Sequence, residues 1–218
     1  AVVAAAPQQP QTAALTQLML PGDVMYEGEV FANIPHGHGK AVYLNGDRYD
    51  GEWNRGKRNG QGTMTWAKGG QWVGEFRDYE PWNGTGLFYY DNDQYDGAIA
   101  NGLRHGQGKY TWQNGDCYEG EWLNGNKHGQ GKIVWGVGGE WNGTFRNDQP
   151  WNGAGVFLYE GGRYEGTITD GRKNGTGTFD AANGDHYEGE WVMGAFTGTG
   201  KITYMNGEIY EGQFLNGK

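Results

Sequence analysis

Hydrophobic and polar positions alternate along this chain in short runs that favour β-strands. In the run YEGEWL, residues 118–123, Tyr118 and Trp122 share one face of an extended strand, and Glu119 and Glu121 share the other. The turn signal NGNK follows, and a second alternating run then leads to the sequence KIVW. The two runs and the turn between them predict a β-hairpin. We expect no helix after residue 25.

The hairpin pattern recurs every 23 residues. Each repeat begins with an aromatic residue that is followed two positions later by glycine. The nine repeats begin at Tyr26, Tyr49, Trp72, Tyr95, Tyr118, Trp141, Tyr164, Tyr187 and Tyr210. The sequence PWNGTG at 81–86 returns as PWNGAG at 150–155, which is 69 residues later. This second period indicates that a block of three repeats was itself duplicated.

Short turns on both sides of each strand predict an antiparallel meander. We therefore expect an all-β fold for residues 26–218. It would be an elongated, twisted, single-layer and open array of about eight 23-residue hairpins plus one edge strand. The glycines at the third position of each repeat leave gaps on the aromatic face, across which neighbouring Tyr and Trp rings are expected to lie.

Residues 1–25 form a separate segment that is rich in Ala, Pro and Gln. It begins without Met, so the segment is either a processed mature end or a trimmed boundary. Leu15, Leu18 and Met19 have helical spacing, which predicts a short capping helix at 12–20.

Three stretches of the chain resemble MORN repeats, named for membrane occupation and recognition nexus. They are YDGEWNRGKRNGQG at 49–62, YEGEWLNGNKHGQGK at 118–132 and YEGEWVMGAFTGTGK at 187–201. The resemblance covers residues 26–218. Similar arrays occur in radial-spoke heads, junctophilins, plant phosphoinositide kinases and a lysine methyltransferase, where catalysis lies in another domain.

The resemblance implies a non-catalytic scaffold or protein–protein interaction subunit of a larger assembly. Its expected partners are other proteins, with a peptide or helix along an aromatic groove, or a second copy of the chain. A cytoplasmic or cytoskeleton-associated protein is implied, and an organelle lumen or secretion after removal of a presequence is the alternative.

Composition and charge narrow the classes of partner. The formal net charge of −9 argues against duplex nucleic acid and against simple docking on anionic lipid. The chain has no apolar stretch of about 18 residues that would predict a membrane span. Phospholipid binding stays an alternative function, because Arg55, Lys57, Arg58 and Lys68 could form a local basic spot.

Motifs that suggest chemistry have simpler explanations in the repeat. Gly129-Gln130-Gly131 lacks the upstream Gly and the following Ser or Thr of a phosphate-binding loop, and no helix follows it. The Glu residues recur from repeat to repeat, and cross-strand pairs with Lys account for them. We therefore predict no catalytic residue and no cofactor.

The histidines do not predict a metal site. Three of them hold one repeat position that Asn fills elsewhere, namely His36, His105 and His128. Equivalent positions in successive hairpins lie about 10 Å apart, whereas zinc needs its ligands within about 2.1 Å. We expect these side chains to act in turns.

The aromatic face is the predicted partner-binding surface, because a single sheet offers nothing to cover it and partial exposure is expected. Its residues are Tyr49, Trp53, Trp66, Trp72, Phe76, Tyr95, Trp112, Tyr118, Trp122, Trp135, Trp141, Phe145, Tyr164, Tyr187 and Trp191. Tyr210, Gly212 and Phe214 are candidates for edge-strand pairing with a second chain. A carbohydrate-binding or enzymatic protein that uses the Trp row is a further alternative.

Overall fold

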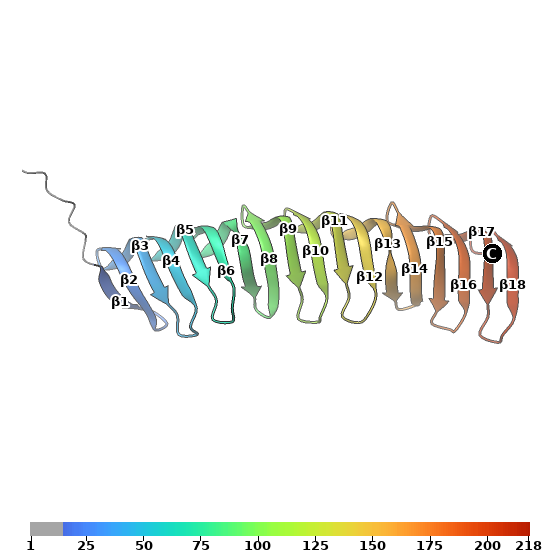
Figure 1. Ribbon diagram of the computed structural model, residues 1–218, viewed down its shortest axis with the longest axis horizontal. Helices are drawn as coiled ribbons and strands as arrows, with labels where there is room; N and C mark the ends of the chain where they lie inside the picture. The colour runs from blue at the N-terminus through green and yellow to red at the C-terminus, as the bar shows by residue number, and fades with distance from the viewer. Residues whose placement is uncertain (1–14) are drawn as a thin grey trace, which may run out of the picture. The chain divides into compact units, whose positions relative to one another are not determined.

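The computed structural model describes residues 15–218, and every regular element in that range is a β-strand (Figure 1). The chain divides into two compact units, one up to Gly86 and one from Leu87 onward, so that the division falls inside strand β7. We call them the N-terminal unit and the C-terminal unit.

The strands of the N-terminal unit pair in chain order, each antiparallel to the next. They are β1 (Thr16–Leu20), β2 (Val24–Phe31), β3 (Ile34–Val42), β4 (Arg48–Asn54), β5 (Lys57–Thr65), β6 (Gln71–Arg77) and β7 (Glu80–Tyr90). The predicted hairpin meander is therefore confirmed in this unit.

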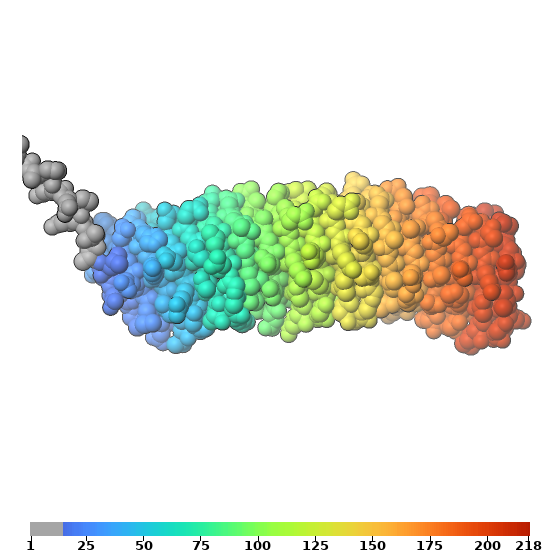
Figure 2. Space-filling view, in the orientation of Figure 1, coloured from blue at the N-terminus to red at the C-terminus, as the bar shows by residue number. Residues whose placement is uncertain are grey.

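The C-terminal unit continues the same pattern. Its remaining strands are β8 (Asp93–Ala100), β9 (Leu103–Thr111), β10 (Cys117–Leu123), β11 (Asn126–Val134), β12 (Glu140–Arg146), β13 (Gln149–Tyr159), β14 (Gly162–Thr169), β15 (Arg172–Ala181), β16 (His186–Val192), β17 (Ala195–Thr203) and β18 (Ile209–Phe214). Consecutive strands are antiparallel neighbours from β8 to β18. On the surface, the repeats of this unit form successive bands in chain order (Figure 2).

The segment before the first repeat differs from the prediction. Thr16–Leu20 is strand β1, not part of a helix, and Leu18 lies opposite Tyr26 of β2. The run TQLML alternates between half-buried and exposed side chains, so it also fits a strand, and pairing with β2 satisfies its backbone groups. The helix expected at 12–20 is therefore wrong over 16–20, and residues 12–14 lie outside the described range.

Candidate edge strand β18 is paired in register with β17. Tyr210 is 46% exposed and Phe214 is 8% exposed, with Gly212 between them on the same face. Pairing of this strand with a second chain stays a prediction.

The glycines of a hairpin lie directly beneath its first aromatic ring, which is tyrosine or tryptophan. Gly120 pairs with Gly131 across the hairpin, and the Tyr118 ring lies over both. A Cβ atom on Gly131 would stand 2.5 Å from the Tyr118 hydroxyl oxygen, which no real side chain tolerates. The same hydroxyl donates a 2.8 Å hydrogen bond to the carbonyl of Glu121. The predicted use of glycine to make room for rings is confirmed.

The Gly-x-Gly sequences supply the backbone conformation that the hairpin requires. Gly129 has φ of +56°, a conformation that favours glycine. The next amide, of Gln130, donates a 2.8 Å hydrogen bond to the Glu121 carboxylate. Equivalent carboxylates accept from the corresponding amides in three other repeats, at Glu29, Glu52 and Glu190. These carboxylates therefore hold the middle of the second strand, next to the glycine of positive φ.

Aspartates link the turn of one repeat to the turn of the next. The Asp47 carboxylate accepts a 2.8 Å hydrogen bond from the Ala67 amide. Asp116 accepts from Gly136 at 2.8 Å, and Asp185 accepts from the amide of Met205 at 2.9 Å. Asp93 accepts the same kind of bond from the Gln113 amide at 2.9 Å, so four repeats carry this cross-link at their twenty-second position.

Aromatic rings on one face of the sheet form the core of each unit. The first ring of a repeat is covered edge-on by the fifth-position ring of the next repeat, except after Trp72 and Trp141, where the fifth position is Ile99 and Ile168. Tyr118 and Phe145 illustrate this, with ring centroids 4.9 Å apart and planes at 82°. Trp122 also donates its Nε1 hydrogen to the Gly108 carbonyl at 3.1 Å. Edge-to-face packing stabilises such pairs beyond the area that they bury.

Candidate functional site

Most of the aromatic residues expected to line an open groove are buried, which corrects the prediction from the sequence. Twelve of the fifteen are only 0–3% exposed: Tyr49, Trp53, Trp72, Phe76, Tyr95, Tyr118, Trp122, Trp141, Phe145, Tyr164, Tyr187 and Trp191. The glycine gaps let each first ring lie flat against its hairpin, and the fifth-position ring then covers it. The rings at the first and fifth positions therefore cover one another and leave little ring surface for a partner.

The other three candidates lie in a second row on the same face. Trp66, Trp112 and Trp135 are half-buried and hold the eighteenth position of their repeats. Related positions carry further exposed or half-buried rings, and we call the whole set the outer ring row: Tyr43, Trp66, Tyr90, Trp112, Trp135, Tyr159 and Tyr204. This row is the aromatic surface that a partner can reach.

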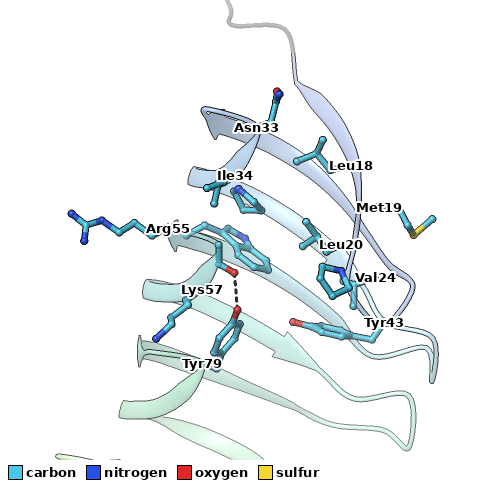
Figure 3. Close-up of a pocket in the computed structure, with 14 residues that line it drawn as sticks. Leu18, Met19, Leu20, Val24, Asn33, Ile34, Tyr43, Arg55, Lys57 and Tyr79 are labelled. Carbon is cyan, nitrogen blue, oxygen red and sulfur yellow. Dashed lines mark hydrogen bonds between the residues drawn. The ribbon is translucent and has the colours of Figure 1, made fainter.

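We call the face of the sheet that carries the aromatic rings the ring face. A pocket of about 590 Å³ lies on this face in the N-terminal unit. Leu18 and Leu20 of β1 point toward it, whereas Met19 points away (Figure 3). The outer-row ring of Tyr43 and the turn residue Tyr79 also line it. The pocket is therefore an apolar recess that β1 closes on one side.

Several lining residues were not among the candidates from the sequence. Val24, Ile34 and Pro35 line the pocket together with the β1 leucines. The sequence does contain a signal for the leucines, because strand alternation places Leu18 and Leu20 on one face. The helical interpretation of the same residues obscured it.

The tenth position of four repeats adds a cation to the face that carries the rings, namely Arg58, Arg104, Lys127 and Lys173. In the second repeat it is Arg58, which lies opposite Trp53 and has its Cζ atom 5.5–5.7 Å from four ring centroids. Its guanidinium also donates to the Tyr43 hydroxyl at 3.1 Å and to the Tyr79 carbonyl at 2.9 Å. A cation is thus held among aromatic rings.

The basic spot considered for phospholipid binding is divided between two environments. Arg58 is engaged with the rings, and Lys57 forms an ion pair of 3.0 Å with Asp78. Two of the four cations therefore already have partners within the protein, which weakens the case for a lipid headgroup site.

The titratable groups of the ring face are suited to hydrogen bonding. Burial is the main cause that raises the pKa values of Tyr26, Tyr110 and Tyr164 to about 12. Their hydroxyls stay protonated at neutral pH and act as donors, as in the 2.8 Å bond from Tyr110 to Asp93. Within residues 15–218 no group of three or more His, Cys, Asp or Glu side chains is arranged to hold a metal ion.

Comparison with protein families identifies the repeat. The MORN repeat model matches residues 26–48, 49–71, 95–117, 118–140, 164–186, 187–209 and 210–218. The chain belongs to the MORN repeat family. The third and sixth repeats fall outside these matches, and both contain the PWNG sequence that departs from the pattern. Membership in this family fits a protein-binding role.

A curated relative shares part of the array. Phosphatidylinositol 4-phosphate 5-kinase 1 of Oryza sativa subsp. japonica is 36% identical over 58 residues. That stretch is 27% of this chain and 7% of the kinase, so the chain spans a small part of this relative.

Two solved structures show limited likeness. The E1021V mutant of the TCP10 domain of Danio rerio CPAP is 11% identical, with 91% of this chain and 99% of that chain covered and a TM-score of 0.36. The SAS-4 TCP domain of Drosophila melanogaster, solved with a proline-rich motif of Ana2, is 10% identical, with 98% and 99% covered and a TM-score of 0.27. Scores of this size carry no weight for the function of this chain.

The described residues contain no helix with the length and apolar character needed to cross a membrane.

Proposed function

We propose that this chain is a non-catalytic protein-interaction subunit that binds a segment of a partner protein on its ring face. The N-terminal pocket takes a bulky apolar side chain of that segment, and Tyr43 and Trp66, the outer-row rings of the same unit, carry the rest of the contact. The observation that supports this most directly is the 590 Å³ recess with Leu18, Leu20 and Ile34 at its walls.

The size and lining of the recess match a peptide anchor. A large apolar side chain that enters such a recess loses its hydration, and a few anchors of this kind supply most of the energy of an interface. Tyr43 and Tyr79 add rings whose hydroxyls already have protein partners, since Tyr43 accepts from Arg58 and Tyr79 donates to the Gly56 carbonyl at 2.8 Å. The pocket is therefore formed before a partner arrives.

A matched pair of exposed apolar residues tests the proposal. Ile34 is 48% exposed in the pocket, and Val73 is 45% exposed on the opposite face of the sheet from the adjacent Trp72 ring. Peptides would be selected from a random library on the full chain and then measured by calorimetry against Ile34→Glu and Val73→Glu. We expect selected peptides to share a bulky apolar residue.

The two variants separate a pocket from a general sticky surface. Ile34→Glu should weaken the selected peptides by about tenfold or more, which corresponds to about 1.4 kcal/mol, and Val73→Glu should change binding less than twofold. Equal weakening by both variants, or selected peptides without a shared apolar residue, would contradict the proposal. Circular dichroism of each variant confirms that the sheet is retained.

A further inference from the structure

Lys173 places a cation among four aromatic rings of the C-terminal unit. Its Nζ atom lies 5.1 Å from the ring centroid of Tyr159, 4.7 Å from Tyr164, 4.3 Å from Phe179 and 4.7 Å from Trp191. The rings come from β13, β14, β15 and β16, so the fold assembles the cage from four consecutive strands. Within residues 15–218 no carboxylate lies within ion-pair distance of this amine.

The cage leaves the charge of Lys173 only partly compensated. Ring faces attract a cation, but they replace part of the water that would otherwise solvate it. This desolvation lowers the pKa of Lys173 below its usual range. Lys173 is half-buried and Tyr159 is 48% exposed, so the cage is not closed off from solvent.

Arg104 and Lys127 repeat the arrangement in two adjacent hairpins. The Arg104 Cζ atom lies 4.6 Å from the Trp122 ring centroid, and the Lys127 Nζ atom lies 5.2 Å from that of Trp112. Burial is the main cause that lowers the pKa of Lys127, and the neighbouring Arg104 guanidinium lowers it further, although Asp148 acts in the opposite direction. Arg104 donates one hydrogen bond to the Gly125 carbonyl at 3.0 Å, and neither cation has a carboxylate at ion-pair distance among the described residues.

Lysines on the opposite face of the sheet form ion pairs with carboxylates. Lys109 pairs with Glu119 at 3.9 Å, and Lys132 pairs with Glu140 at 2.8 Å. The chain carries many carboxylates and places them beside the lysines of that face. The three ring-face cations of the C-terminal unit, in contrast, have rings around them and form no ion pair among the described residues.

We propose that Arg104, Lys127 and Lys173 form a cation row that binds carboxylates of an acidic segment of a partner protein. This inference rests on the proposed function, because it assumes that a partner protein binds the ring face and adds that the bound segment is acidic. A carboxylate that meets a half-buried cation gains more Coulomb energy than it does at a fully hydrated site, because the local dielectric constant is lower.

The repeat sets the spacing of the acidic groups. Adjacent hairpins are offset by two strands, or about 10 Å, and Lys127 and Lys173 lie two hairpins apart, or about 19 Å. The partner segment therefore needs acidic groups at about these intervals. An acidic peptide is favoured over duplex nucleic acid, because an extended peptide carries at most one negative charge per about 3.4 Å whereas duplex DNA carries one per about 1.7 Å, and the net charge of −9 opposes the denser chain more strongly.

The test uses the full chain and poly-L-glutamate of about 20 residues as the probe, in low salt so that screening does not mask the effect. Lys127→Met with Lys173→Met removes both ammonium groups and keeps an unbranched apolar stem against the rings. Lys109→Met with Lys132→Met is the matched control, because it makes the same change of charge on the opposite face. Thermal unfolding of every variant reports whether the sheet is intact.

We expect saturable binding of poly-L-glutamate that the ring-face double variant weakens by about tenfold and the control double variant by less than twofold. Equal weakening by the two double variants would show a diffuse charge effect and overturn the inference. The inference also fails if wild-type protein gives no saturable binding, or if duplex DNA binds as tightly as poly-L-glutamate. A purely structural cage would change the unfolding temperature and leave the probe affinity unchanged.

This result is independent of the pocket test. If the ring-face lysine variant leaves the affinity for poly-L-glutamate unchanged while Ile34→Glu weakens the selected peptides, the cation row is excluded and the proposed function stands. The reverse outcome would retain the acidic partner and remove the pocket as its anchor.

Discussion

Two aromatic rows on the same face of the sheet have different environments. The inner row, formed by the first and fifth positions of the repeats, contains residues such as Tyr118 and Trp141 that are completely buried. The outer ring row at the eighteenth position contains half-buried residues such as Trp112 and Trp135. Both rows point the same way, so the face of a strand alone does not determine exposure.

The difference arises from the neighbours along the sheet. An inner ring has glycines beneath it and a ring of the next repeat against its edge, as for Tyr118 and Phe145. An outer ring lies where the chain leaves the strand, and Trp112 begins a turn in which its amide donates to the Asp116 carbonyl. We expect the inner row to determine stability and the outer row to contribute mainly to recognition.

The largest effect should come from removing an inner ring. Trp141→Ala deletes a side chain with 0% exposure whose Nε1 atom has no hydrogen-bond partner, so its contribution is packing alone. We expect a loss of about 3–5 kcal/mol in the free energy of unfolding, measured with denaturant. Trp112→Ala in the outer ring row should cost about 1–2 kcal/mol. Similar losses in both variants would abolish the distinction between the rows.

A smaller loss should follow from filling a gap beneath an inner ring. The Cβ atom of Gly131→Ala would displace the Tyr118 ring, and we expect a loss of about 1–3 kcal/mol. Gly161→Ala is the matched control, because its Cβ would meet nothing within 4 Å. Denaturant unfolding of the two variants measures the difference. An unchanged Gly131→Ala protein would mean that the ring shifts without cost.

The smallest effect should come from loosening the turn that follows an outer ring. Asp116→Ala removes the 2.8 Å bond to the Gly136 amide and should lower the free energy of unfolding by about 1 kcal/mol. Glu160→Ala, at an exposed turn position, is the control and should be neutral. Hydrogen exchange of the Gly136 amide tests the mechanism, since faster exchange in Asp116→Ala alone is expected. Equal exchange in both variants would show that the cross-link has no role.

The repeat period and the use of glycine could be predicted from the sequence because both depend on local geometry. The alternation of YEGEWL places Tyr118 and Gly120 on one face, and the structure has the Gly120–Gly131 pair beneath the ring. The exposure of the face could not be predicted in the same way. It depends on how the Phe145 ring of the following repeat packs against Tyr118, and alternation within one strand contains no information about that contact.

The cation row was missed for a different reason. Lys127 was assigned to a turn, whereas β11 begins at Asn126 and places Lys127 opposite Trp122. Its alternation phase matches that of Gly131, so the signal was present in the sequence. Recognition of the row required the register shift between Gly120 and Trp122, which fixes the cross-strand partner.

The turn-to-turn bonds of Asp47, Asp116 and Asp185 bear on how such an array changes length. Each aspartate needs a following turn that offers a free amide at the correct place, as Ala67, Gly136 and Met205 do. Asp93 accepts the same kind of bond from the Gln113 amide at 2.9 Å, so the repeats that begin at Trp72 and Tyr95 carry the link one after the other. An aspartate at the twenty-second position and a turn amide in the next repeat are therefore sufficient, and a single hairpin that keeps both can be added or removed by design.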